Sequence, residues 1–242
     1  MDAPVTEREV VAAAAPVWRR GVRRPWQAVG RAGLAIAGCA LATFCFALTI
    51  RAGLGLGPLF AVQDGLATRL GISIGTSVML VGVAMVFLAV ALKSWPGPGT
   101  LALPFFGGTF LNLILPHLPT IHGWLLQFAV VVVATWFMGL GGSLIIKGAL
   151  GAAAYDAVMM GLHRRIRGPI VLIRLAMETV MLLVGWGLGG AIGVGTVITG
   201  LLIGPSMHLW LRLLGVVQPA VGLTTSSSGP PAMAAPTPSP TE

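Results

Sequence analysis

Residues 147–178, KGALGAAAYDAVMMGLHRRIRGPIVLIRLAME, hold most of the polar side chains found within the apolar part of this chain. Asp156, Arg174 and Glu178 stand there among apolar residues. Arg174 and Glu178 are four residues apart, so on a helix they share one face and can pair. A basic group lies between Asp156 and Arg174 and is formed by His163, Arg164, Arg165 and Arg167. Ionisable residues inside apolar sequence mark a candidate functional site of a membrane protein.

The composition places the chain among integral membrane proteins. Charged residues make up 9% and hydrophobic residues 56% of the 242 residues, and the mean hydropathy is +0.91. A soluble domain carries roughly 25% charged residues. The net charge of +8 does not indicate nucleic-acid binding, because most of the arginines flank apolar segments, where they act as orientation signals. We therefore predict an all-α polytopic membrane protein, with the lipid bilayer as its surroundings and no nucleic-acid partner.

Six apolar segments are of the length and composition expected of spanning helices. They cover residues 32–50, 72–92, 101–115, 124–146, 170–188 and 196–214. A shorter candidate helix at 59–70 follows a Gly-rich break, and Pro58 suits its first turn. Residues 1–25 and the Ser/Pro/Thr-rich residues 218–242 are predicted to be disordered tails, the first of them cytoplasmic.

An internal repeat emerges when the chain is aligned with itself at an offset of 96 residues. The offset superimposes Gly65-Leu66 on Gly161-Leu162, and it matches two Gly-x-Gly-Thr sequences that end at Thr100 and Thr196. The predicted repeats are residues 26–121 and 122–217, each with three long helices and one short one. Paired short segments interrupted by glycine and proline are typical of transporter folds. The breaking residues are expected to be structural: Gly55, Gly57, Pro58, Gly151, Gly193, Gly195, Gly204 and Pro205.

The number of spans depends on whether the short helices cross the bilayer. If they are half-length or re-entrant, six helices span the membrane and the two repeats are inverted. If they cross, eight helices span it and the repeats are parallel. Six spans with a cytoplasmic N-terminus place most lysines and arginines inside, so the positive-inside rule favours that arrangement in the plasma membrane.

Several motifs resemble the YczE/YitT-like family of bacterial integral membrane proteins. They include residues 51–58 (RAGLGLGP), residues 71–76 (GISIGT), and Arg174 with Glu178. Gly193-x-Gly195-Thr196 and residues 201–205 (LLIGP) complete a resemblance that covers about residues 31–214. Family members usually carry Pro-Trp-Asp at the start of the first short helix, but Leu59-Phe60 follows Pro58 here. The corresponding position of the second repeat, Asp156, is acidic. The family is largely uncharacterised biochemically, so the resemblance implies an architecture rather than a reaction.

Each polar group has a structural and a functional interpretation. The Arg174–Glu178 pair is either a self-neutralised tie within the bundle or a gate or ion-coupling site. Asp156 either complements the positive end of its helix or lines a site at the membrane midplane. The basic group is either an anchor beside anionic headgroups or an anion site.

Nothing in the sequence indicates catalysis, a cofactor or a bound metal. The glycine runs lack the strand and lysine of a nucleotide-binding loop, and the chain contains no HExxH motif. We therefore expect a non-enzymatic membrane protein, and its first functional hypothesis is a small secondary transporter or permease that works as a homodimer. The alternative is an accessory or regulatory membrane protein that assists another membrane or biosynthetic system.

Overall fold

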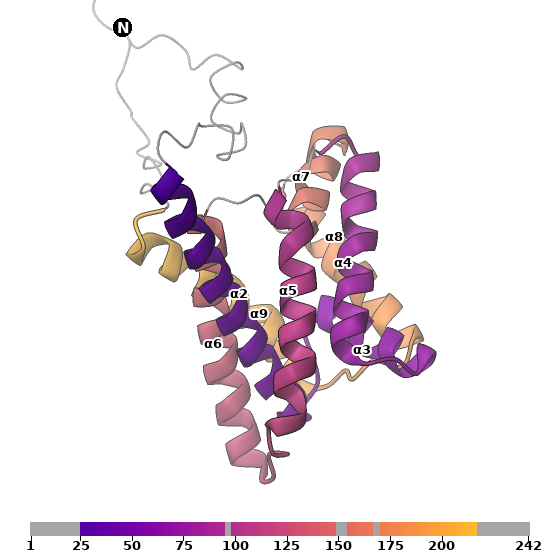
Figure 1. Ribbon diagram of the computed structural model, residues 1–242. Coiled ribbons are helices and arrows are strands. Elements are labelled where there is room, and N and C mark those ends of the chain that lie inside the picture. The colour runs from indigo at the N-terminus through magenta and orange to yellow at the C-terminus, as the bar shows by residue number, and fades with distance from the viewer. Residues whose placement is uncertain (1–24, 95–97, 149–153, 167–169, 217–242) are drawn as a thin grey trace, which may run out of the picture.

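The computed structural model describes residues 25–94, 98–148, 154–166 and 170–216 of the chain. Within these residues every regular element is a helix, as predicted (Figure 1). The helices are α2 (Pro25–Ala52), α3 (Pro58–Leu70), α4 (Ile74–Ala91), α5 (Pro98–Ile114), α6 (Trp124–Gly148), α7 (Ala154–Ile166), α8 (Ile170–Gly187) and α9 (Val194–Leu213), with a 3-10 turn at Leu115–His117. The protein is an all-α polytopic membrane protein.

Helix length separates the spanning helices from the short ones. Among the described residues, five segments are long and apolar enough to cross a membrane, and they lie in α2, α4, α5 with its 3-10 turn, α6 and α9. Helix α8 has 18 residues, as many as α4, and is therefore about 27 Å long. Helices α3 and α7 have 13 residues each. At about 20 Å they are too short to cross a core of about 30 Å.

The residues that flank α3 begin and end helices as expected. Pro58 occupies the first turn of α3, and Gly71 ends the helix in the left-handed conformation at φ 63°. Ser73 then caps α4 by accepting a hydrogen bond from the amide of Thr76. Helix α2 begins at Pro25, seven residues before the predicted apolar segment. The predicted boundary of the N-terminal tail at residue 25 therefore falls on the first residue of a helix.

Helices at corresponding positions of the two halves run in opposite directions. In Figure 1, α2 descends and α6 ascends, α4 ascends and α8 descends, and α5 descends and α9 ascends. The short helix α3 lies at the lower end of the bundle and α7 at the upper end. Helices α4, α6 and α9 end at the upper end, where α2 begins. Lys93, Lys147 and Arg212, which lie at or just after those helix ends, therefore share one end of the molecule.

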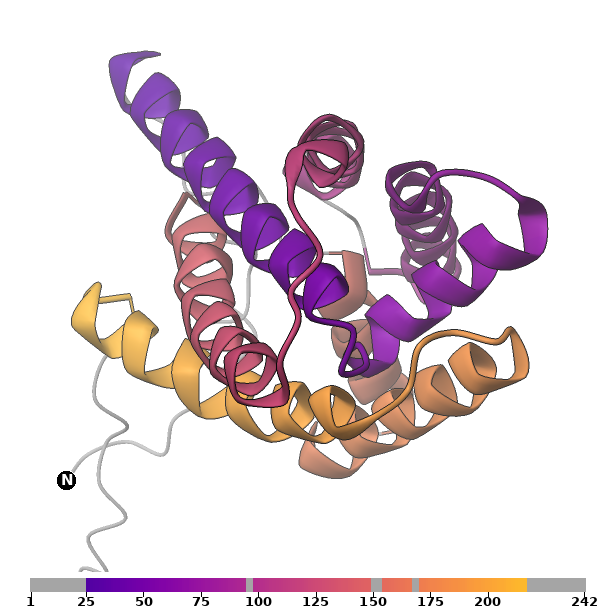
Figure 2. The same cartoon turned by 90° about the horizontal axis from the view of Figure 1, so that it is seen from below.

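The two long helices α2 and α6 pack on each other through glycine and lie on the left of the view in Figure 2. A Cβ added to Gly38 would lie 2.6 Å from the Gly141 carbonyl oxygen, and one added to Gly141 would lie 2.7 Å from the Gly38 carbonyl oxygen. Helix α5 packs on α2 and helix α9 on α6. Each short helix packs on a long helix of the other half, α3 on α8 and α7 on α4.

The α4–α5 pair of the first half is closely packed, whereas the corresponding α8–α9 pair of the second half is open. Helix α4 packs on α5, where a Cβ on Gly82 would lie 2.4 Å from Pro104 Cβ, and a Cβ on Gly108 would lie 2.4 Å from the Gly75 carbonyl oxygen. Among the described residues, α8 and α9 make no comparable packing. A Cβ on Gly200 or Gly204 of α9 would meet nothing within 4 Å. Gly204 was predicted to be structural, but no close approach requires a glycine there in this structure.

Candidate functional site

Arg174 and Glu178 form the ion pair that their spacing predicted. Arg174 Nε lies 3.2 Å from Glu178 Oε1 within one face of α8, and the side chains are 42% and 28% exposed. The pair lies on a helix that is otherwise free of charged residues. Pairing offsets part of the cost of holding each charge in an apolar environment.

Asp156 and Tyr155 of α7 join this pair. Asp156 lies in the first turn of α7, and Arg174 of α8 acts on it electrostatically. Tyr155 lies close enough to Glu178, Arg174 and Asp156 to interact with each of them electrostatically. The Tyr155 hydroxyl is buried and has no hydrogen-bond partner among the described residues. We call Tyr155, Asp156, Arg174 and Glu178 the polar cluster.

The structure therefore brings the three predicted site residues together and adds a fourth. Tyr155 was not singled out from the sequence, although it is the one tyrosine of the chain and precedes Asp156. The cluster combines two carboxylates, one guanidinium and one phenol. Its formal charge with both carboxylates ionised is −1, since Arg174 neutralises one of them.

The positions 96 residues before the three charged residues of the polar cluster carry no polar side chain. Phe60, Val78 and Gly82 correspond to Asp156, Arg174 and Glu178. Phe60 stacks on Phe46 of α2, with ring centroids 4.0 Å apart, and Gly82 lies against Pro104. The polar side chains thus belong to one half of the chain only.

The basic group is partly engaged in structural contacts. Arg164 donates a 2.8 Å hydrogen bond from Nη2 to Ser94 Oγ, which ties the end of α7 to the end of α4. Arg165 is exposed and His163 is partly buried. Arg167 lies outside the described residues. Within the group, Arg164 therefore joins two helix ends at the upper face of the bundle.

The glycine breaks bring the two halves into direct backbone contact. Gly55 has φ 104°, and a Cβ on it would lie 2.4 Å from the Gly193 amide nitrogen. The Leu54 carbonyl accepts a 2.7 Å hydrogen bond from the Gly195 amide. Gly57 contacts Thr199 of α9, Pro205 lies inside α9, and the predicted structural residue Gly151 lies outside the described residues.

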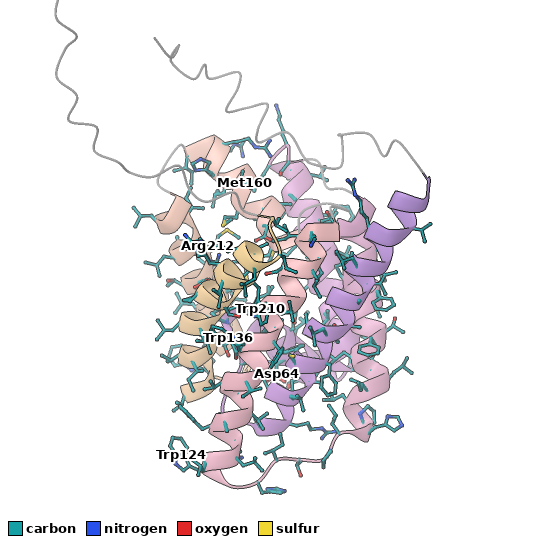
Figure 3. All side chains as sticks on the ribbon, turned by 90° about the vertical axis from the view of Figure 1, so that its left-hand side faces the viewer. Asp64, Trp124, Trp136, Met160, Trp210 and Arg212 are labelled. Carbon is teal, nitrogen blue, oxygen red and sulfur yellow. The ribbon has the colours of Figure 1, made fainter. Side chains whose placement is uncertain are left out.

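Helix α3 also holds the turn between α8 and α9. The Asp64 carboxylate accepts a 2.8 Å hydrogen bond from the Ala191 amide. Arg69 donates hydrogen bonds to the carbonyls of Gly187 and Leu188. The base of the α8–α9 opening is therefore fixed to the first half, while the two helices diverge above it. Figure 3 labels Asp64 in the lower half of its view.

No group of three or more His, Cys, Asp or Glu that could hold a metal ion occurs within the described part of the chain. Cys39 and Cys45 are buried, unpaired thiols. The Cys39 thiol is hydrogen-bonded to the Leu103 carbonyl oxygen at 3.6 Å, so it contributes to the packing of α2 on α5.

Residues 29–212 match a family described as "Family of unknown function (DUF6198)". The chain belongs to this family. It is 32% identical over 173 residues to the "Uncharacterized membrane protein YczE" of Bacillus subtilis (strain 168), which covers 69% of this chain and 79% of that protein. It is 28% identical over 167 residues to an "Uncharacterized protein" of Haemophilus influenzae (strain ATCC 51907 / DSM 11121 / KW20 / Rd), covering 69% and 77%. No solved structure matches the chain significantly.

These similarities confirm the predicted YczE-like family and the multi-pass membrane character. The family match covers all eight helices of the described residues apart from the ends of α2 and α9. It includes the polar cluster and both short helices.

Proposed function

We propose that this protein is a small secondary transporter of the plasma membrane, built from two inverted repeats, residues 26–121 and 122–217. The observation that carries the proposal is the polar cluster beside a helix pair that is open in one half and closed in the other. Transporters of this kind bind their substrate between repeats and expose it by moving one helix pair against another.

The inverted duplication is supported by contacts that recur at the offset of 96 residues. A Cβ on Gly65 of α3 would lie 2.7 Å from Leu188 Cβ, and one on Gly161 of α7 would lie 2.7 Å from Leu92 Cβ. A second recurrence joins α2 to α5 and α6 to α9. The Cys39–Leu103 hydrogen bond has its counterpart in the 3.5 Å contact between the Thr135 and Thr199 hydroxyls. The opposite directions of corresponding helices support inversion rather than parallel repeats.

The substrate or coupling ion that fits the polar cluster is a cation. The two carboxylates share one arginine, so a bound cation or a proton restores neutrality. An uncompensated charge inside a bilayer costs at least about 2.5–3.5 kcal/mol on insertion scales. The buried Tyr155 hydroxyl offers one more oxygen ligand at the same place.

Alternating access would consist of α8 closing on α9 while α4 opens from α5. Closure in the register of the first half would set Glu178 against Gly200, as Gly82 is set against Pro104. It would also set Leu175 against Gly204, as Met79 lies against Gly108. In the first of these contacts the glycine moves from α4 to α9, and in the second it keeps its place, on α5 and then on α9. Helix α9 therefore has room for the larger side chains of α8. A closed α8–α9 pair would cover the polar cluster.

Distances between spin labels test this movement. Leu183 and Leu201 are exposed on α8 and α9, and Phe87 and Phe105 are their exposed counterparts on α4 and α5. Double-cysteine variants at each pair, in a background with Cys39→Ala and Cys45→Ala, are labelled and measured in nanodiscs by double electron–electron resonance. We expect a long-distance population for the α8–α9 pair that is rare for the α4–α5 pair. A single short distance in both pairs would overturn the mechanism.

Flux in proteoliposomes tests transport itself. Vesicles are given gradients of protons, Na⁺, K⁺ or tetraethylammonium, and a Glu178→Gln variant serves as the comparison. We expect saturable flux of at least one cation that the variant loses. Absence of flux for all of them, together with one short label distance, would favour the accessory role. The same vesicles show whether a homodimer forms, through cross-linking of the reconstituted protein.

A further inference from the structure

Helices α8 and α9 leave apolar surface uncovered at the α8–α9 opening. Leu175 follows Arg174 of the polar cluster in the chain and is 58% exposed, and Leu201 of α9 is 72% exposed. A Cβ on Gly200 or Gly204 would meet nothing within 4 Å, so α9 leaves room on its uncovered face. The surface around the polar cluster is therefore apolar and is not filled by the helices themselves.

Glu178 lies at the edge of α8 that is turned toward α9. Met177 is buried and marks the packed face of α8. Glu178 follows it by one residue, which is about 100° further around an α-helix, and its side chain is 28% exposed. The corresponding edge of α4 carries Gly82, which lies against Pro104 of α5. Since α8 and α9 correspond to α4 and α5, Glu178 is turned toward the α8–α9 opening.

The oxygen atoms around Glu178 suit an organic cation better than an inorganic one. Ca²⁺ takes about six to eight oxygen ligands, and Mg²⁺ needs a regular octahedral set. Glu178 Oε1 already accepts a hydrogen bond from Arg174 Nε, and the Thr179 hydroxyl donates to the Leu175 carbonyl. No set of three or more potential metal ligands occurs in the described part of the chain. An inorganic ion would therefore lose its hydration here without full replacement, which is costly.

We infer that the polar cluster and the α8–α9 opening together bind an amphipathic organic cation, such as a quaternary or protonated amine with an aliphatic body. Its charge lies beside the Glu178 carboxylate, and its apolar groups occupy the space beside Gly200 and Gly204. Burial of each methylene group raises the affinity about fourfold, so an apolar body supplies the binding energy that a bare ion lacks. This substrate class rests on the proposed function, because it concerns the same site.

The corresponding positions of the first half do not form a second site of this kind. Gly82 stands where the second half has Glu178. Pro104 stands where the second half has Gly200, and it lies in the space that Gly200 leaves free. We therefore expect one molecule of the cation to bind per protein.

Equilibrium binding of [¹⁴C]tetraethylammonium to the full-length protein in nanodiscs tests the substrate class, with empty nanodiscs as the blank. The competitors are K⁺, tetramethylammonium and tetrapropylammonium, which carry the same charge and an increasing apolar area. We expect saturable binding, and displacement by tetrapropylammonium at a concentration at least about tenfold lower than that of tetramethylammonium, because more methylene groups are buried. K⁺ should be the weakest competitor. Equal potency of the three competitors, stronger displacement by K⁺ or no saturable binding would overturn the inference.

Single variants separate the role of charge from that of space. Glu178→Gln removes the carboxylate charge and should abolish binding. Gly200→Leu places an aliphatic side chain in the α8–α9 opening, where the fold has room for it, and should weaken tetrapropylammonium binding at least about tenfold through overcrowding. Gly33→Leu of α2 is the matched control, since a Cβ there also meets nothing within 4 Å, and it should bind as the unmodified protein does. Unaltered binding in Glu178→Gln or Gly200→Leu would also overturn the inference.

The flux measurements in proteoliposomes distinguish a wrong substrate class from a wrong function. Flux of Na⁺ or K⁺ that Glu178→Gln loses, without binding of any tetraalkylammonium ion, would overturn the substrate class and leave transport standing. Saturable tetraethylammonium binding that Glu178→Gln loses, without flux of any cation, would support the organic-cation site and overturn transport.

Discussion

Gly161 of α7 lies against Leu92, which follows α4, so closely that a Cβ on the glycine would stand 2.7 Å from Leu92 Cβ. The same distance separates a Cβ on Gly65 of α3 from Leu188 Cβ. Each short helix therefore packs on a long helix of the other half through a glycine. These two contacts join the halves on the side of the molecule opposite to the α2–α6 pair.

Substituting either glycine should weaken the joint between the halves. Gly65→Ala and Gly161→Ala each place a methyl group where neighbouring atoms leave no room, which costs about 1–3 kcal/mol of unfolding free energy. Unfolding of the purified protein on titration with sodium dodecyl sulfate measures the loss. Gly33→Ala is the control, because a Cβ there meets nothing within 4 Å and alanine favours the helix by about 1 kcal/mol. Equal stability of all three variants would contradict the packing role.

Removing Arg174 should leave two carboxylates without their cation. Arg174→Gln is expected to destabilise the protein by about 2.5–3.5 kcal/mol, the scale of an unpaired charge in a membrane. Arg174→Gln/Glu178→Gln should recover part of that loss, because only Asp156 then remains charged. The same detergent titration measures a double-mutant cycle of the two positions. Strict additivity of the two single losses would show that the ion pair contributes no coupling energy.

Replacing Asp64 should loosen the turn between α8 and α9. Asp64→Asn keeps an acceptor for the Ala191 amide but removes its charge, and Asp64→Ala removes the acceptor. A hydrogen bond to a charged group contributes about 1.5–3 kcal/mol, so amide exchange of Ala191 should accelerate at least tenfold in Asp64→Ala. Hydrogen–deuterium exchange with mass spectrometry measures residues 188–193. Thr68→Ala is the neighbouring control, as its hydroxyl bonds within α3; unchanged exchange in Asp64→Ala would count against the contact.

The two short helices should be accessible from opposite sides of the membrane. Leu70 and Ile166 end α3 and α7, and they are 57% and 61% exposed. In a background with Cys39→Ala and Cys45→Ala, a membrane-impermeant maleimide added to intact cells should label Leu70→Cys but not Ile166→Cys. Permeabilised cells should show labelling of both, which controls for reactivity. Labelling of both from the same side would support eight spans.

Particular residues show which features of the structure could be predicted from the sequence. Pro58 and Gly71 set the two ends of α3, because one fixes φ and the other tolerates a positive φ, and both effects are local. The four-residue spacing of Arg174 and Glu178 predicted their pairing for the same reason. Tyr155 was not identified, since its importance depends on which helices surround it. Gly204 looked equivalent to Gly108, but α8 does not pack on it as α4 packs on Gly108.

The sequence by itself determined the membrane class, the approximate positions of the long helices, the presence of short helices and the presence of ionisable residues in the apolar part. These follow from composition and from local backbone chemistry, which each segment carries with it. The tertiary structure alone decided that Asp156 and Tyr155 join Arg174 and Glu178, and that one helix pair is open. Those features arise where segments distant in the chain meet, and a repeated sequence can pack differently in its two copies because each copy faces different side chains.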